Sequence, residues 1–118
     1  MIERTRELPR ESWHAYFDAL SRVVAGHPAE VEVESLKLGD QVEAHWVPLI
    51  GVTYDHKDDV LEVALEGLDH LIHRPRRIWV EESGPHFVAA EIERADGVTE
   101  IIRLKEPLAL PAPENARS

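Results

Sequence analysis

The chain has 118 residues, 43% of them hydrophobic, which is enough to bury one core and predicts a single domain spanning residues 1–118. Its 23 acidic residues against 13 basic ones give a net charge of -10, and so acidic a surface argues against DNA or RNA as a partner. The absence of cysteine excludes disulfides, thiol nucleophiles and cysteine-ligated zinc. With no apolar run of membrane-spanning length and no apolar signal segment, we expect a cytoplasmic, acidic protein without a membrane partner.

The first predicted element is a helix over residues 9–25. Pro9 suits its first turn, where the missing N–H costs nothing, and Gly26 suits its C-terminal cap. Apolar residues recur at the three-, four- and seven-residue spacing that places them on one helical stripe, which we expect to pack on the sheet that follows. This stripe consists of Trp13, Tyr16, Phe17, Leu20 and Val24.

Alternation of apolar and polar residues predicts strands through most of the remaining chain. Asp96-Gly97 tolerates positive φ and closes the clearest hairpin. Pro48 interrupts one strand and requires an edge, a bulge or a bend at that point. The predicted strands cover residues 29–35, 41–47 with a continuation at 49–54, 60–66, 77–82, 87–94 and 98–105.

One helix followed by about six short strands in hairpin order predicts an antiparallel α+β fold. Bends at Pro48 and Gly51 favour a strongly bent sheet that forms a small, partly closed barrel of the SH3 or Sm type, with the N-terminal helix packed on it. Trp13 and Trp46 fall on faces assigned to the core. The proline-rich residues 107–118 are expected to form an extended tail.

Four motifs carry a resemblance to a known family. They are LPRESW at residues 8–13, WVPLIGVTYD at 46–55, LEGLDHLI at 65–72 and LPAP at 110–113. With these motifs the chain resembles a family of small bacterial proteins of unknown function, over nearly its whole length. The resemblance implies a free-standing bacterial domain and brings no activity or site residues with it.

His70 and His73, together with Asp69, form the best candidate for a metal site. Two imidazoles three residues apart meet on one face if residues 68–73 form a helical turn, and the aspartate can join them as a ligand or orient one of them. A zinc ion would need a further ligand, such as another histidine from a neighbouring strand or loop.

The alternative for the same segment is structural. Leu68, Leu71 and Ile72 would then close the open end of the barrel, while the two histidines cap the turn and face water. In that case no metal and no other cofactor is bound, and zinc remains the alternative.

Three arginines lie on either side of a proline just beyond the histidines. Arg74 and Arg76 could form a fork for a phosphate or carboxylate, because Pro75 favours an extended conformation before it. Alternatively, these arginines and Arg77 neutralise glutamates across the sheet or meet an acidic patch of a second subunit. Trp79 points away from its apolar neighbours and is either an interface anchor beside the arginines or part of a second covered face.

No pattern typical of nucleophilic catalysis or of a phosphate-binding glycine loop is present. The sequence therefore favours a non-enzymatic binding or assembly module that associates with itself or with another protein through an exposed edge strand and Trp79. The alternatives are a metal-assisted hydrolase or a small-anion-binding protein that uses the Asp69–Arg77 corner.

Overall fold

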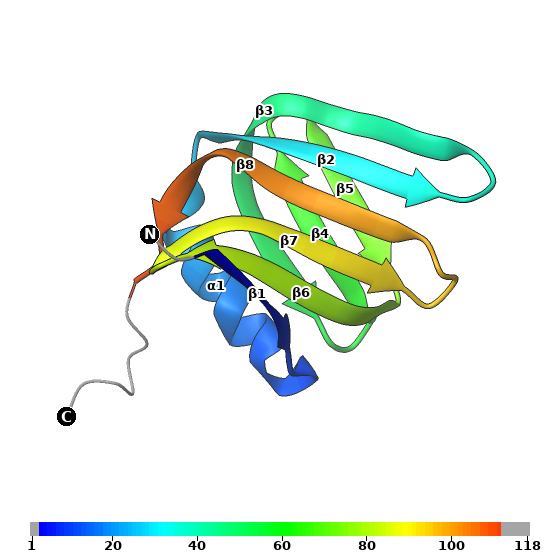
Figure 1. The fold of residues 1–118 in the computed structure, drawn as a ribbon, viewed down its shortest axis with the longest axis horizontal. Helices are drawn as coiled ribbons and strands as arrows, with labels where there is room; N and C mark the ends of the chain where they lie inside the picture. Colours follow the sequence, from blue (N-terminus) through cyan, green and yellow to red (C-terminus); the bar gives the residue numbers. More distant parts are fainter. Residues whose placement is uncertain (1–2, 112–118) are drawn as a thin grey trace.

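The computed structural model describes residues 3–111. Helices and strands form an α+β fold dominated by one large antiparallel sheet of eight strands, in the order β1-β6-β7-β8-β2-β3-β4-β5 (Figure 1). The helix is α1 (Trp13–Val24), preceded by a 3-10 turn, η1 (Arg10–Ser12). The strands are β1 (Glu3–Leu8), β2 (His27–Ser35), β3 (Gly39–Asp55), β4 (Val60–Leu65), β5 (Leu68–His73), β6 (Pro75–Ser83), β7 (His86–Arg94) and β8 (Thr99–Ala109).

The sheet is open, because β1 and β5 lie at its two ends and do not pair with each other. The α+β class is confirmed, but the prediction of about six strands in a partly closed barrel is wrong in strand number and in closure. β1 escaped prediction because its residues are almost all charged and only Leu8 is buried. The tail expected from residue 107 is also wrong at its start, since β8 continues to Ala109, and residues 112–118 lie outside the described part.

Strand β3 bends sharply and belongs to two parts of the sheet. Its first half pairs with β2 and its second half, from Leu49 on, pairs with β4. The corner contains Pro48, as the sequence indicated, and Trp46, whose φ of 52° is unusual for a residue with a side chain. This backbone turns Trp46 away from the interior, so its assignment to the core is wrong, whereas Trp13 is buried.

Helix α1 lies along the edge of β3 that β2 leaves free after the corner. Ser21 Oγ accepts from the N–H of Val52 at 2.9 Å and donates to its carbonyl at 2.8 Å, so one side chain replaces a missing strand neighbour. A Cβ at Gly51 would lie 3.2 Å from this Oγ, which explains the glycine. Within residues 3–111 no helix is long and apolar enough to cross a bilayer.

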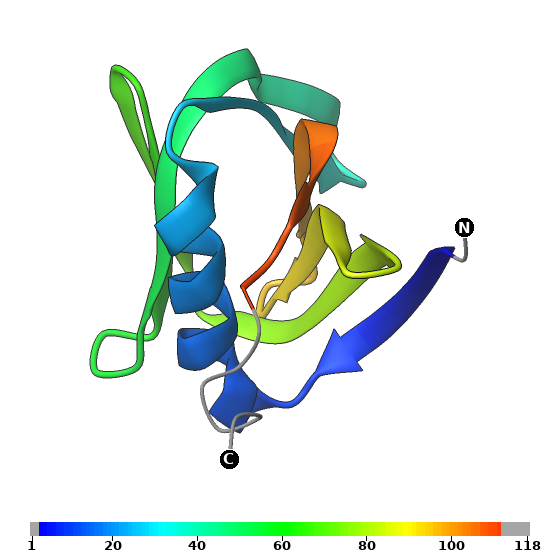
Figure 2. The ribbon, with the colours of Figure 1, turned by 90° about the vertical axis from the view of Figure 1, so that its left-hand side faces the viewer.

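The sheet curves around an interior that α1 covers from one side (Figure 2). A buried carboxylate, Glu82, fastens the N-terminal elements to β6. Arg6 donates to it through two nitrogens at 2.9 and 3.2 Å, and Tyr16 Oη donates at 2.8 Å. Burial alone would raise the pKa of Glu82, but these hydrogen bonds outweigh burial and leave the pKa below its ordinary value. The helix contributes Trp13, Phe17, Leu20 and Val24 to the core.

Candidate functional site

Residues 68–73 form the end strand β5 and not a helical turn. Successive side chains of a strand point to opposite faces, so His70 and His73, three residues apart, lie on opposite sides of the sheet. His70 is half-buried on the inner side, and His73 is exposed on the outer side with Asp69. The helical turn that the metal hypothesis required is therefore absent, and the structure does not bring these three side chains together.

The apolar residues of β5 are divided between the two faces. Ile72 is fully buried, but Leu68 and Leu71 are 41% and 44% exposed. The expectation that all three close the interior is thus wrong for the two leucines. They leave apolar surface on a strand that pairs on one side only, with β4.

His70 reaches across the interior to a carboxylate on β8. Its Nε2 lies 2.6 Å from Oε1 of Glu100, a residue only 1% exposed, and Arg94 donates to the other carboxylate oxygen at 3.0 Å. The hydrogen bond that His70 donates to Glu100 raises the pKa of His70. Burial lowers this pKa, the negative charges of Glu100 and Glu43 raise it further, and the positive charge of Arg94 lowers it. Sequence reasoning missed Glu100, although its two-residue spacing from the inward Ile102 and Leu104 places it on the same face of β8.

The arginines after β5 are mostly paired within the chain. Arg76 bonds to Glu93 at 2.6 and 3.2 Å, and Arg77 bonds to Glu7 at 2.9 and 3.1 Å. Arg74 is exposed and has a φ of 53°, where proline was expected to impose an extended backbone. A fork made by the first two arginines is therefore not preformed.

Trp79 lies half-buried on the outer side of the sheet, on β6. The guanidinium of Arg77 lies 4.8 Å from its ring centroid, a cation–π contact that covers part of the ring. A small groove beside it runs over β1, β6, β7 and β8. In the strand order, β6 is second and β5 is last. Trp79 and the edge strand β5 therefore do not form one surface.

A wider hollow of about 550 Å³ opens beside the first turn of α1. At its base, Arg10 donates to Tyr54 Oη at 3.0 Å and to the carbonyl of Pro75 at 3.1 Å, and Tyr54 donates to Asp59 at 2.7 Å. Little in the sequence indicates this hollow beyond the three-residue spacing of Glu11 and His14. It is lined by Arg10, Glu11, His14, Tyr54, His56 and Asp59.

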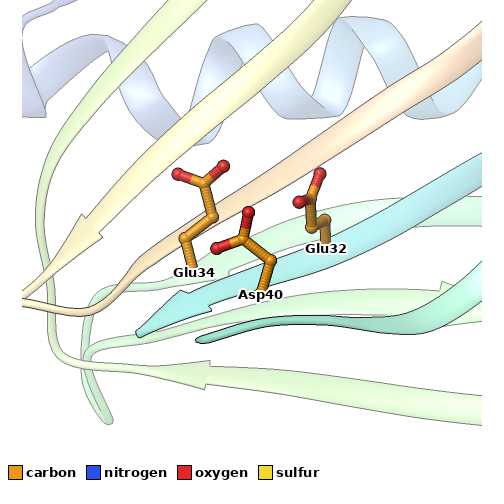
Figure 3. Close-up of side chains that lie close together, drawn as sticks. All are labelled: Glu32, Glu34 and Asp40. Atoms are coloured by element: carbon orange, nitrogen blue, oxygen red, sulfur yellow. The ribbon is translucent and has the colours of Figure 1, made fainter. Parts of the chain in front are cut away.

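Three carboxylates on the β2–β3 hairpin lie side by side, those of Glu32, Glu34 and Asp40 (Figure 3). Their oxygens lie within 4.8 Å of one another, and partial burial followed by the neighbouring negative charges raises the pKa of Glu34. Among residues 3–111 this is the group of three side chains whose possible metal-ligand atoms all lie within 4.8 Å of one another. None of the predicted metal ligands belongs to it. All three residues are at least partly exposed, as expected for a solvated face of the hairpin.

The outer face of β5 carries one further conflict of charge. Asp69 lies there beside the outward Glu62 of β4, and it raises the pKa of Glu62 by hydrogen bonding to it and by its own negative charge. Among the described residues, neither Asp69 nor His73 forms an ion pair. This end of the sheet therefore has a surplus negative charge next to an unpaired imidazole and two exposed leucines.

Comparison with known proteins places the chain in a family. Residues 4–113 match the family described as "Family of unknown function (DUF5335)", so the chain belongs to it and the resemblance drawn from its motifs is confirmed. An uncharacterized protein of Aquifex aeolicus (strain VF5) is 40% identical over 108 residues, which cover 91% of this chain and 97% of the relative. No solved structure matches the chain.

Proposed function

We propose that this member of the DUF5335 family is a non-enzymatic assembly module that takes up a protein strand along the free edge of β5. One observation carries the proposal. The backbone of β5 pairs with β4 alone, and the strand has neither the proline, the lysine nor the bulge that proteins commonly use to protect an edge. An extended segment laid against such an edge gains backbone hydrogen bonds, and exposed side chains then select it.

The opposite end of the sheet supports the choice of β5 by contrast. β1 also pairs on one side only, but its residues Arg4 and Arg6 lie in a row of charged side chains, which oppose the addition of another strand. The exposed Leu68 and Leu71 of β5 instead favour a partner, because pairing removes their apolar surface from water.

The buried ionisable groups support a binding role over a catalytic one. Glu82 and Glu100 are each hydrogen-bonded through both carboxylate oxygens to side chains of other elements. Within residues 3–111 no buried side-chain polar atom lacks a partner. Groups that are fully engaged in fastening strands together are not poised to exchange protons with a substrate.

The experiment is binding of a labelled peptide that carries residues 66–73, which supplies an extended strand of known sequence. We expect the peptide to bind the protein and to slow amide hydrogen exchange within β5. Leu71→Lys should abolish both effects, since lysine at an edge prevents strand addition. The matched control is Ile50→Lys, at a position that is 56% exposed on β3, and it should leave both unchanged. Exchange in β5 that does not respond to the peptide would refute the proposal.

A second candidate function is binding of a small anion in the hollow beside α1. The guanidinium of Arg10 is held over the ring of Trp13, 4.3 Å from its centroid, and its side chain keeps 52% of its exposure. The imidazoles of His14 and His56 line the same hollow and can donate to an anion when protonated. Phosphate or citrate should then raise the melting temperature of the protein, and a His14→Ala/His56→Ala variant should lose the increase. Equal increases in the melting temperatures of the wild type and the variant would exclude this hollow as the binding site.

A further inference from the structure

The outer face of β5 has a symmetric arrangement of side chains. Asp69, Leu71 and His73 follow one another at two-residue spacing, so all three project from the same face of the strand. The apolar residue stands in the middle, with an acid on one side of it and an imidazole on the other. Read in the opposite direction, the same strand presents the imidazole first and the acid last.

Antiparallel pairing of β5 with β5 of a second copy uses this symmetry. Residues opposite each other in an antiparallel pair have residue numbers with a constant sum, and a pairing centred on Leu71 places the two leucines opposite each other. The same register places Asp69 opposite His73 of the second copy, and His73 opposite Asp69 of the second copy. A two-fold axis through Leu71 relates the copies, as a closed dimer requires.

We propose that the strand accepted by β5 is β5 of a second copy, in the register centred on Leu71. The inference rests on the proposed function, and it adds the identity of the partner and the pairing. Each contact in this register corrects something that the single chain leaves unsatisfied. The two leucines cover each other, and the imidazole of one copy meets the aspartate of the other. Asp69, which lies beside the carboxylate of Glu62, thereby gains a hydrogen-bond donor.

Other registers lack these contacts. Sliding one copy by two residues keeps the faces aligned but places Leu71 opposite a charged side chain or an imidazole. A slide by one residue pairs outer side chains of one copy with inner side chains of the other. This register is excluded because an inner residue such as Ile72 is already fully buried in its own chain. The order of side chains along the outer face therefore selects one register, and a strand of only six residues predicts a weak dimer.

The test uses two variants that cannot pair with themselves. His73→Asp places aspartate opposite Asp69 in its own dimer, and Asp69→Lys/His73→Lys places lysine opposite lysine. Mixed, the two variants place aspartate opposite lysine at both positions. By analytical ultracentrifugation each variant alone should dimerise at least about tenfold more weakly than the wild type, and the mixture should recover an affinity within about threefold of it.

A matched pair of variants on β1 controls for net charge. Thr5→Asp and Glu3→Lys/Thr5→Lys make the same charge changes at exposed positions at the opposite end of the sheet from β5, and they should dimerise as the wild type does. If only the mixture of the two β5 variants recovers dimerisation, misfolding is not the cause of their weak self-association. Two misfolded proteins would stay weak when they are mixed.

Two results would overturn the inference. A wild type that stays monomeric at high micromolar concentration rules out the second copy as partner, and a β5 mixture that stays as weak as its components rules out the register. Neither result removes the proposed function if the peptide of residues 66–73 still protects β5 in a manner that depends on Leu71, since the edge would then serve a different protein. Loss of that protection as well would remove both.

Discussion

Replacing His70 should loosen the inner attachment of β5. Its Nε2 is the donor to one oxygen of Glu100, whose side chain is 1% exposed, and Arg94 is the donor to the other. His70→Ala leaves the first oxygen without a partner in a nearly dry interior. An unsatisfied buried acceptor costs about 1–3 kcal/mol, and a broken buried ion pair about 3–5 kcal/mol. Because the His70 side chain keeps 17% of its exposure and water can enter, we expect a loss of about 2 kcal/mol in the free energy of unfolding.

The same contact predicts a dependence on pH. The hydrogen bond to Glu100 raises the pKa of folded His70 above its ordinary value of 6.5, which it has in the unfolded chain. Between these two values the folded protein holds a proton that the unfolded chain has released, so the free energy of unfolding falls as pH rises. The contribution is complete below pH 6.5 and is lost as pH rises through the raised pKa.

The assay is urea unfolding followed by tryptophan fluorescence at a series of pH values on both sides of 6.5. His70→Gln keeps a hydrogen-bond donor but does not titrate, so the stability difference between wild type and variant should shrink as pH rises. His56→Gln, in an exposed turn, serves as the control and should follow the wild type. A difference between wild type and His70→Gln that stays constant with pH would refute the coupling of His70 to Glu100.

Three further substitutions test other parts of the fold by urea unfolding. Tyr16→Phe removes the donor to Glu82 at 2.8 Å and should lower the free energy of unfolding by about 1.5 kcal/mol; an unchanged value would show that Arg4 and Arg6 alone satisfy that carboxylate. Burial, followed by the negative charges of Asp40 and Glu32, raises the pKa of Glu34. Glu34→Gln removes this repelled charge, so it should stabilise the protein by a few tenths of a kcal/mol at neutral pH and by nothing in acid; a loss at neutral pH would contradict this. Arg74→Gly should be about 1 kcal/mol more stable than Arg74→Ala, because a φ of 53° is strained for a residue with a Cβ, and equal stabilities would show that the backbone there is relaxed.

Local patterns in the sequence were sufficient for the helix and the hairpins. The apolar stripe of α1 and the turn at Asp96-Gly97 are contained in a few consecutive residues, and both predict the observed elements. The bend of β3 at Pro48 was visible for the same reason, since a proline removes a backbone donor wherever it stands.

The two end strands could not be found in this way. β1 shows no apolar face because it covers little of the core, and its place is fixed by Arg6, which reaches Glu82 from 76 residues away in sequence. β5 carries apolar residues on both faces, which reads as a break in the alternation although Ile72 points inward and Leu71 outward. A strand at the end of a sheet needs only one buried face to pack on the core. Apolar residues on its other face are not required by the fold of the single chain, so the usual alternation does not predict them.

The segment that carries the predicted metal ligands is a strand, whereas the metal hypothesis required a helical turn. The sequence drew attention to the histidines, and the spacing of three residues suggested a shared face only for a helix. In a strand that spacing places them on opposite faces. His70 therefore bonds to Glu100 on the inner side, and His73 is exposed on the outer side. The partner of His70 is 30 residues away on β8, and no pattern within either segment joins the two.

This separation assigns different tasks to the two faces of β5. The inner face, with His70 and Ile72, fastens the strand to the rest of the fold, whereas the outer face is free to meet a partner. Leu71→Lys should therefore change the unfolding free energy by no more than about 0.5 kcal/mol while it abolishes dimerisation. His70→Gln should do the reverse at neutral pH, lowering stability first and weakening the dimer only as far as β5 detaches. A variant of the outer face that unfolds the protein, or a destabilised His70 variant that dimerises more tightly, would show that the two faces are not independent.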